Sequence, residues 1–298
     1  MTQGSIWRPL LFIGGPLSLV VAGFISFCQA EKPGENVKEP VYRVSKATPG
    51  TAEVPVARVE NQHPLIPAID IAQDGLKSIR ANIKDYTATL VKRERINGEL
   101  NDHEFATIKV RQERTENGKV VPFAVYLKFL KPKAIAGREV IWVKGENNNK
   151  LHAHEGGGSI LPSVWLDPNG FLAMRGQKYP ITEIGMETLV VKLIERANDD
   201  MKHGQCQVQI TPNFKVNGRN CTLLQVTHPD KKPEYLFHIA RVYVDAQLNI
   251  PIRYEAYLWP STAGGKPELD EEYTYVDVKT NVGLTDTDFD SNNPNYNF

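Results

Sequence analysis

The sequence lacks a charge imbalance, because 35 Lys and Arg residues balance 35 Asp and Glu residues. Nucleic-acid binders normally carry a basic excess that displaces counterions, so the composition argues against that class. Cysteine is also scarce: the three cysteines form no Cys-x-x-Cys motif, which excludes a thioredoxin-type redox pair and a cysteine zinc knuckle. The mean hydropathy of −0.36 excludes a polytopic membrane protein. What is present is an ordinary globular composition with one apolar segment.

That apolar segment lies in residues 1–30, where Arg8 precedes a long stretch without charge. A positive start, an apolar middle and a small residue at the end, here Ala30, are the parts of a secretory signal peptide. Two other fates stay open. Cys28 could carry a lipid, although Phe27 stands where a bacterial lipobox has a small residue, and the segment could be retained as a single membrane anchor. All three predict export to the periplasm or the cell envelope.

The next segment, residues 31–62, contains four prolines and a single aromatic residue, Tyr42. Such a stretch buries too little apolar area to offset the loss of chain entropy on folding. It is predicted to be a disordered linker. The remaining residues, 63–298, suit a single domain.

Two helices are predicted from apolar residues spaced three and four apart. The first carries Leu65, Ile69 and Ile83 on one side and has Pro67 in its opening turn. The second covers residues 182–202, with Thr182 as its N-cap. Because the second helix is amphipathic, it should cover an apolar surface.

About ten strands are predicted from alternating apolar and polar residues and from Asn-Gly turns. They lie on both sides of the second helix, an order that excludes a parallel β-α-β sheet. The fold class is therefore α+β: a strongly curved antiparallel sheet, an incomplete β-barrel, whose concave face is covered by an N-terminal helix and a helical insertion. The predicted strands occupy residues 86–95, 104–114, 123–129, 139–144, 150–155, 206–214, 221–228, 237–245, 251–258 and 269–279.

Cys206 and Cys221 are the two cysteines of the predicted domain, and an oxidising compartment favours a disulfide between them. A two-residue turn at Asn217-Gly218 would instead pair Cys221 with Phe214 and leave Cys206 far along the ladder. The predicted disulfide therefore requires a wider loop, with the chain reversal near Pro212. Two free thiols are the alternative.

Several stretches resemble the exported bacterial family known as domain of unknown function 1571, over roughly residues 62–298. More distantly, the order of elements resembles the LolA/LppX-type lipoprotein and lipid carriers. Pro251 to Glu255 match a "P-x-R-x-E" strand of those carriers, and Asn281 and Asp288-Phe289 match their later positions. This resemblance implies an incomplete barrel around helices and apolar ligand binding without catalytic residues. The stretches similar to the first family are residues 85–100, 123–143, 217–229, 248–260 and 271–290.

His152 and His154 belong to the most metal-like cluster, since residues two apart on a strand point to the same face. A third ligand would have to come from elsewhere, such as Asp167 or His203. Two half-exposed structural histidines are the simpler interpretation, and we expect no metal and no cofactor.

These observations predict a non-enzymatic protein that binds or carries a hydrophobic ligand, either a lipid or a lipoprotein acyl chain, in the cell envelope. Two alternatives remain: an envelope structural or interaction protein with a filled core, and a metal-dependent hydrolase using His152 and His154. A small hydrophobic molecule, a lipoprotein or an envelope protein is the expected partner, and nucleic acid is not. The predicted cavity residues are Leu90, Ile108, Val110, Val125, Leu127, Phe129, Leu189, Leu193, Ile252, Tyr254 and Leu258.

Overall fold

The computed structural model describes residues 44–45, 54–55, 62–156 and 159–298. The predicted signal peptide, residues 1–30, lies outside the described residues, and so does most of the predicted linker. Within that linker, the short strands β1 (Val44–Ser45) and β2 (Val54–Pro55) both pair with β12 (Gln207–Val216). Among the residues that the structure describes, no helix has both the length and the apolar composition that crossing a bilayer requires.

The described residues contain one large antiparallel sheet of fourteen strands. One run of consecutive strands precedes α3 (Met186–Asp200) in the sequence, and a second run follows it. The two runs are joined where the C-terminal strand β16 (Glu268–Thr280) pairs with β3 (Asp85–Ile96). A separate hairpin consists of β6 (Arg114–Glu116) and β7 (Lys119–Val121). The remaining strands are β4 (Glu99–Leu100), β5 (Glu104–Arg111), β8 (Ala124–Lys131), β9 (Glu139–Val143), β10 (Leu151–His154), β11 (Val164–Leu166), β13 (Arg219–Thr227), β14 (Ile239–Asp245) and β15 (Pro251–Leu258).

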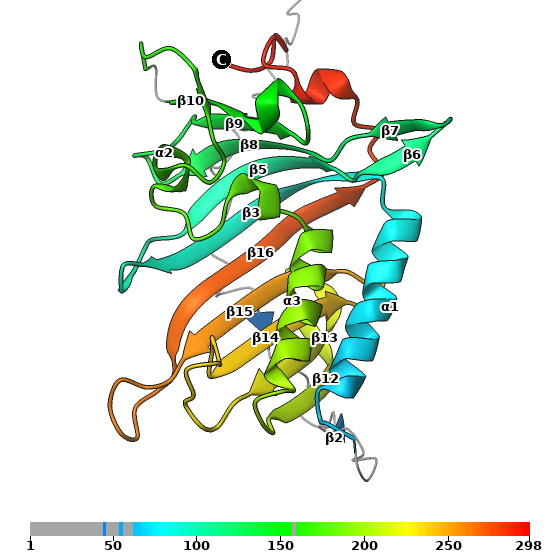
Figure 1. Ribbon diagram of the computed structural model, residues 1–298, viewed down its shortest axis with the longest axis vertical. Coiled ribbons are helices and arrows are strands. Elements are labelled where there is room, and N and C mark those ends of the chain that lie inside the picture. Colours follow the sequence, from blue (N-terminus) through cyan, green and yellow to red (C-terminus); the bar gives the residue numbers. More distant parts are fainter. Residues whose placement is uncertain (1–43, 46–53, 56–61, 157–158) are drawn as a thin grey trace, which may run out of the picture. The chain divides into compact units, whose positions relative to one another are not determined.

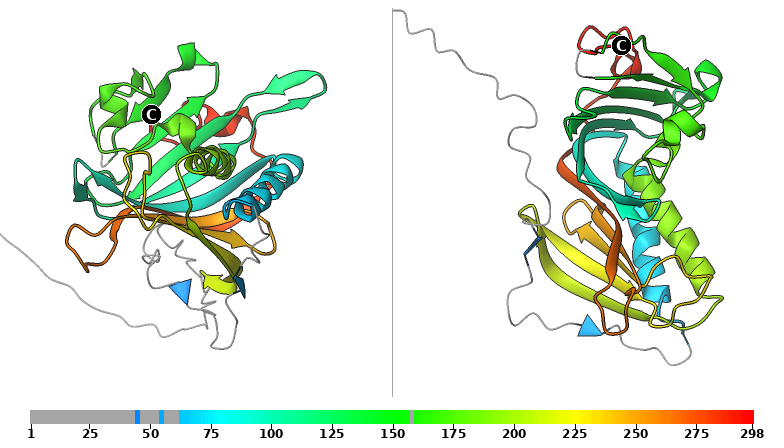
Figure 2. Two further views of the ribbon diagram at one scale, coloured as in Figure 1. Left: turned by 60° about the horizontal axis from the view of Figure 1, so that its bottom comes forward. Right: turned by 90° about the vertical axis from the view of Figure 1, so that its left-hand side faces the viewer.

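The main path through the sheet runs β1-β12-β13-β14-β15-β16-β3-β5-β8-β9-β10-β11, so β1 and β11 are its two ends. The sheet curves around its helices without closing into a barrel (Figure 2). The predicted fold class, an α+β protein with a curved and incompletely closed antiparallel sheet, is therefore confirmed.

Both long helices, α1 (Ile66–Asn82) and α3, lie side by side on the same face of the sheet (Figure 1). The first matches the predicted helix, with proline in its first turn. The second begins later than predicted. Thr182 is in a short 3₁₀ turn, Ile181–Glu183, and Gly185 is the N-cap instead. Gly185 has φ of 134°, a conformation that side-chain-bearing residues avoid, so the helix cannot extend back through it.

The main core lies between the sheet and these helices. Tyr86 is fully buried there, and its hydroxyl accepts a hydrogen bond of 3.1 Å from the backbone N–H of Met186, which ties the start of α3 to β3. Most of the predicted cavity residues are part of this packed core. They are Leu90, Ile108, Val110, Val125, Leu127, Phe129 and Ile252.

The predicted Cys206–Cys221 disulfide is wrong: both cysteines are free and buried. Asn217 and Gly218 form the tight turn between β12 and β13, because both have positive φ and Val216 pairs directly with Arg219. The ladder places Cys221 opposite Phe214 and ends at the pair Gln207–Thr227. Cys206 precedes that last pair, so the two cysteines lie roughly 20 Å apart along the strands, far beyond disulfide reach.

Candidate functional site

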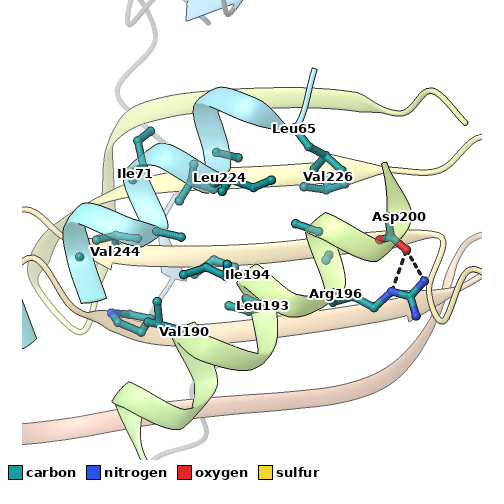
Figure 3. Close-up of a pocket in the computed structure, with 18 of the residues that line it drawn as sticks. Leu65, Ile71, Val190, Leu193, Ile194, Arg196, Asp200, Leu224, Val226 and Val244 are labelled. Atoms are coloured by element: carbon teal, nitrogen blue, oxygen red, sulfur yellow. Dashed lines mark hydrogen bonds and ion pairs between the residues drawn. The ribbon is translucent and has the colours of Figure 1, made fainter. Parts of the chain in front are cut away.

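An apolar cavity of about 90 Å³ lies between α1, α3 and one face of β13 and β14 (Figure 3). Among the described residues that line it, only Arg196, Asp200 and Asn249 contribute ionic or amide side chains. Apolar lining with a few polar groups is typical of a site for a hydrophobic or amphiphilic ligand. The apolar lining residues are Leu65, Ala68, Ile69, Ile71, Ala72, Gly75, Val190, Leu193, Ile194, Ala197, Leu224, Val226, Phe237, Ala240, Val242, Val244 and Pro251.

The wall formed by α1 depends on small residues. Ala68, Ala72 and Gly75 recur at spacings of four and three, so they lie along one side of the helix. A Cβ atom at Gly75 would lie 3.6 Å from the carbonyl oxygen of Asn249, in ordinary van der Waals contact. The glycine therefore leaves open volume rather than relieving a clash.

The opposite wall is α3, where Val190, Leu193 and Ala197 follow the same spacing. The prediction that this helix covers an apolar surface is confirmed. Leu193 lines the cavity, whereas Leu189 packs half-buried against a cluster that contains Phe237 and Tyr254.

The floor of the cavity consists of alternate residues of two paired strands. Leu224 and Val226 belong to β13, and Ala240, Val242 and Val244 belong to β14. Leu224 pairs with Val242 and Val226 with Ala240, so all five side chains project from the same face of the sheet.

The polar end of the cavity is built around Asp200, which is only 2% exposed. Its carboxylate accepts hydrogen bonds from Nε and Nη2 of Arg196, one turn earlier on α3 (Figure 3). On the other side of Asp200 lies His228, which is fully buried, with Nε2 3.4 Å from Asp200 Oδ2. Burial lowers the pKa of His228, against the opposing effect of the Asp200 charge.

The hydrogen bonds of His228 determine its tautomer. Its Nδ1 lies 3.2 Å from the carbonyl oxygen of Phe237, which can only accept, so Nδ1 carries the hydrogen. In the neutral ring, Nε2 then presents a lone pair toward the Asp200 carboxylate and is left without a hydrogen-bond partner among the described residues. The Tyr235 ring stacks on this imidazole at 4.0 Å between centroids, and its buried hydroxyl also has no hydrogen-bond partner there. Buried atoms of this kind are costly and mark a place where a proton or a polar ligand group would be stabilised.

The same loop, residues 228–238 between β13 and β14, holds the C-terminal end of α3. Arg196 Nη2 donates to the carbonyl oxygen of Glu234 at 2.5 Å, and Lys232 Nζ donates to that of His203 at 2.8 Å. At the other end of α3, Arg80 of α1 forms a 2.7 Å ion pair with Glu187. The helix is thus tied at both ends, with apolar contacts between.

A buried ionic network adjoins the cavity on the same face of the sheet. Glu94 accepts hydrogen bonds from the Tyr273 hydroxyl at 2.6 Å and from Lys92 Nζ at 3.0 Å. Tyr254, a predicted cavity residue, stacks on Tyr273, with 6.3 Å between the ring centroids. Burial raises the pKa of the neighbouring Glu271, although Lys178 lies 3.1 Å away and opposes that shift. Tyr254 therefore belongs to this network rather than to the cavity lining.

Of the predicted cavity residues, only Leu193 lines this cavity. Leu258 is half-buried at the end of β15. The lining residues absent from that prediction are those of α1, β13 and β14, the other lining residues of α3, and Phe237, Asn249 and Pro251. Their signals were present: small residues at helical spacing on α1, and apolar residues alternating along 224–226 and 240–244.

His152 and His154 lie on β10, away from this cavity. His152 is 2.8 Å from the Ser163 hydroxyl through Nε2 and stacks on Trp165 at 4.1 Å. His203 lies instead after the end of α3. Within the described ranges, no group of three or more His, Cys, Asp and Glu side chains could hold a metal ion.

The model of a family described as "Protein of unknown function (DUF1571)" matches residues 83–298. No curated protein matches the chain in sequence.

Among solved structures, the chain is similar to a putative outer membrane lipoprotein-sorting protein domain from Vibrio parahaemolyticus. That match has 14% identity and a TM-score of 0.36, and covers 75% of this chain and 96% of the other. A LolA superfamily protein from Nitrosomonas europaea matches at 12% identity with a TM-score of 0.29, over 74% of this chain and 97% of the other. The MucA/MucB complex of Pseudomonas aeruginosa contributes a chain at 17% identity with a TM-score of 0.39, over 74% and 60%.

Proposed function

The chain belongs to the DUF1571 family of proteins of unknown function, and we propose that it binds a hydrophobic ligand, a lipid or a lipoprotein acyl chain, without catalysis. The observation that carries this proposal is the apolar cavity between α1, α3 and the β13–β14 face. The proposed location is the periplasm or cell envelope, because residues 1–30 have the composition of an export signal.

A volume of about 90 Å³ is well below the ~300 Å³ at which sites for drug-sized ligands begin. An acyl chain would therefore enter only if α3 moved away from α1. The contacts at the ends of α3 suggest how. The N-terminal end is tied to Tyr86 and Arg80, and the C-terminal end is held by loop 228–238. In this proposal, release of the C-terminal end opens the cavity while the N-terminal end serves as the hinge.

The small volume also favours a second candidate, an envelope interaction protein whose core is simply filled. Mass spectrometry of lipid extracted from the purified full chain, together with titration of a fluorescent fatty acid, separates the two. Ligand binding predicts a co-purifying lipid and saturable fatty-acid binding. Absence of both would favour the filled core.

Variants of α3 sharpen this experiment. Leu193→Asp places a charge in the cavity, and Leu189→Asp places one beside it. Expressed as free energies, the loss of fatty-acid binding in both variants should exceed the loss of folding stability that their melting temperatures report. Val120→Asp is the matched control, because Val120 is 68% exposed on the β6–β7 hairpin. Equal losses of binding and stability would indicate that α3 only fills the core.

A further inference from the structure

The carboxylate of Asp200 has one oxygen that receives no hydrogen bond from the part of the chain that the structure describes. Both guanidinium hydrogen bonds from Arg196 go to Oδ1, and no described group donates to Oδ2. A carboxylate oxygen accepts up to two hydrogen bonds, which water supplies at an exposed site. Asp200 is only 2% exposed and lines the apolar cavity, so a ligand in that cavity can supply the missing donor.

The atom that faces Oδ2 is a second acceptor. His228 Nε2 lies 3.4 Å from it, and the hydrogen of this neutral ring is on Nδ1, which donates to the carbonyl oxygen of Phe237. The imidazole is fully buried, and the Tyr235 ring stacks on it with 4.0 Å between the centroids, so its orientation is held. Two buried acceptors without a donor are costly, and a group that brings its own hydrogen stabilises them.

The charges beside these acceptors disfavour an ionised headgroup of either sign. A carboxylate or phosphate presents only lone pairs to Asp200 and is repelled by its charge. An ammonium group is repelled by the guanidinium of Arg196, whose Nε lies 2.7 Å from Oδ1. Asp199 and Lys202, at the same end of the helix, pair with each other in solvent. The buried charges already balance, so a neutral headgroup is the one that leaves no uncompensated charge.

We propose that the cavity takes a neutral lipid with a free hydroxyl group, a long-chain alcohol or an acylglycerol, and that this hydroxyl donates to Asp200 Oδ2. An ether or ester group is also neutral, but its oxygens only accept. The hydrocarbon chain packs between α1 and α3. When the C-terminal end of α3 moves as the ligand enters, Oδ2 separates from His228 Nε2, and both acceptors become accessible to the hydroxyl. This inference rests on the proposed function, because it names the headgroup of the ligand that the cavity binds.

Three ligands with the same hydrocarbon chain test the headgroup on the purified full chain: 1-decanol, its methyl ether and decanoate. Each competes at neutral pH with the uncharged fluorescent probe N-phenyl-1-naphthylamine. The ether keeps the oxygen and lacks the hydrogen, so its comparison with decanol isolates the donated hydrogen bond. Decanol should bind about tenfold more tightly than the ether, the size expected of one hydrogen bond to a charged group. Decanoate should bind most weakly.

Asp200→Asn removes the free acceptor and keeps the existing contacts. The carbonyl oxygen of the new amide can accept from Arg196, and its N–H group can donate to His228 Nε2. Decanol and its ether should then bind equally. Asp199→Asn is the matched control: the Asp199 side chain is 44% exposed, one residue earlier on α3, and is not part of the cavity lining. This control should leave the difference between decanol and its ether unchanged.

The headgroup assignment and the proposed function fail in different ways. If the probe and all three ligands fail to bind, the proposed function is wrong and the headgroup assignment falls with it. If the ligands bind but the ether or decanoate binds as tightly as decanol, the cavity accepts chains and only the headgroup assignment is overturned. A preference for decanol that survives Asp200→Asn and disappears in Asn249→Ala would show that the hydroxyl bonds to Asn249 instead, and would also overturn it.

Discussion

His228 Nε2 lies 3.4 Å from Asp200 Oδ2, and the two side chains are 0% and 2% exposed. With the Nδ1 hydrogen committed to Phe237, two acceptors face each other unless a proton lies between them. This pair closes the polar end of the cavity and joins α3 to the loop after β13. A change in the protonation of His228 would thus act directly on α3, the helix that covers the cavity, through Asp200.

The first prediction concerns pH. Burial holds the pKa of His228 below its ordinary value of 6.5, so the unfolded chain binds this proton more readily than the folded chain. The free energy of unfolding should therefore fall as the pH decreases through about 6.5. Urea unfolding between pH 7.5 and 5 measures this dependence.

Two variants assign that pH dependence. His228→Gln should make it shallower. His152 also has a lowered pKa, through burial and the nearby His154, so His152→Gln is the necessary comparison. If His228→Gln left the slope unchanged, the buried pair would not be its source.

The second prediction uses Gly75 on α1. Gly75→Ala should raise the free energy of unfolding by about 0.5–1 kcal/mol, because alanine is the better helix former and its Cβ meets only an ordinary contact. The added methyl group also reduces the cavity volume, so fatty-acid binding should weaken. Thermal melts and a binding titration on the same preparation test both effects. Tighter binding in this variant would contradict the assignment of the cavity.

The third prediction concerns the C-terminal end of α3. Arg196→Ala leaves the buried Asp200 carboxylate without its two guanidinium hydrogen bonds, which should cost about 3 kcal/mol of unfolding free energy. Amide hydrogen exchange in the last turn of α3 should accelerate. Lys202→Ala is the control, since its ion pair with Asp199 is exposed and should matter little. Equal effects of the two substitutions would show that the Arg196 contacts do not hold the helix.

The fourth prediction is chemical. The full chain, unfolded without reductant, should titrate three free thiols per molecule, including Cys28. In the folded state, burial raises the pKa of Cys206 to about 12 and that of Cys221 to about 11, so both should react slowly with thiol reagents at neutral pH. Detection of a single free thiol per molecule would show instead that two of the three cysteines are joined in a disulfide.

Local patterns determined the elements of this protein. Apolar and polar residues alternate along β15, although both faces of that strand are buried, and apolar residues repeat every three to four residues along α1. The period of such a pattern specifies strand or helix wherever the pattern is long. Asn217-Gly218 likewise determines its own turn, because both residues tolerate positive φ. The antiparallel class followed from the order of these elements along the chain.

Only the tertiary structure decided what those elements enclose. The pairing of β16 with β3 joins segments about 180 residues apart, and no local pattern specifies such a partner. Apolar residues such as Ile108 and Val242 look alike in the sequence, yet one is packed in the core and the other lines the cavity. The difference depends on how far α1 and α3 stand from the sheet at each point. The distance between the helices and the sheet is set by the volumes of all the side chains packed between them. It therefore depends on contacts between residues far apart in the sequence, which local patterns do not specify.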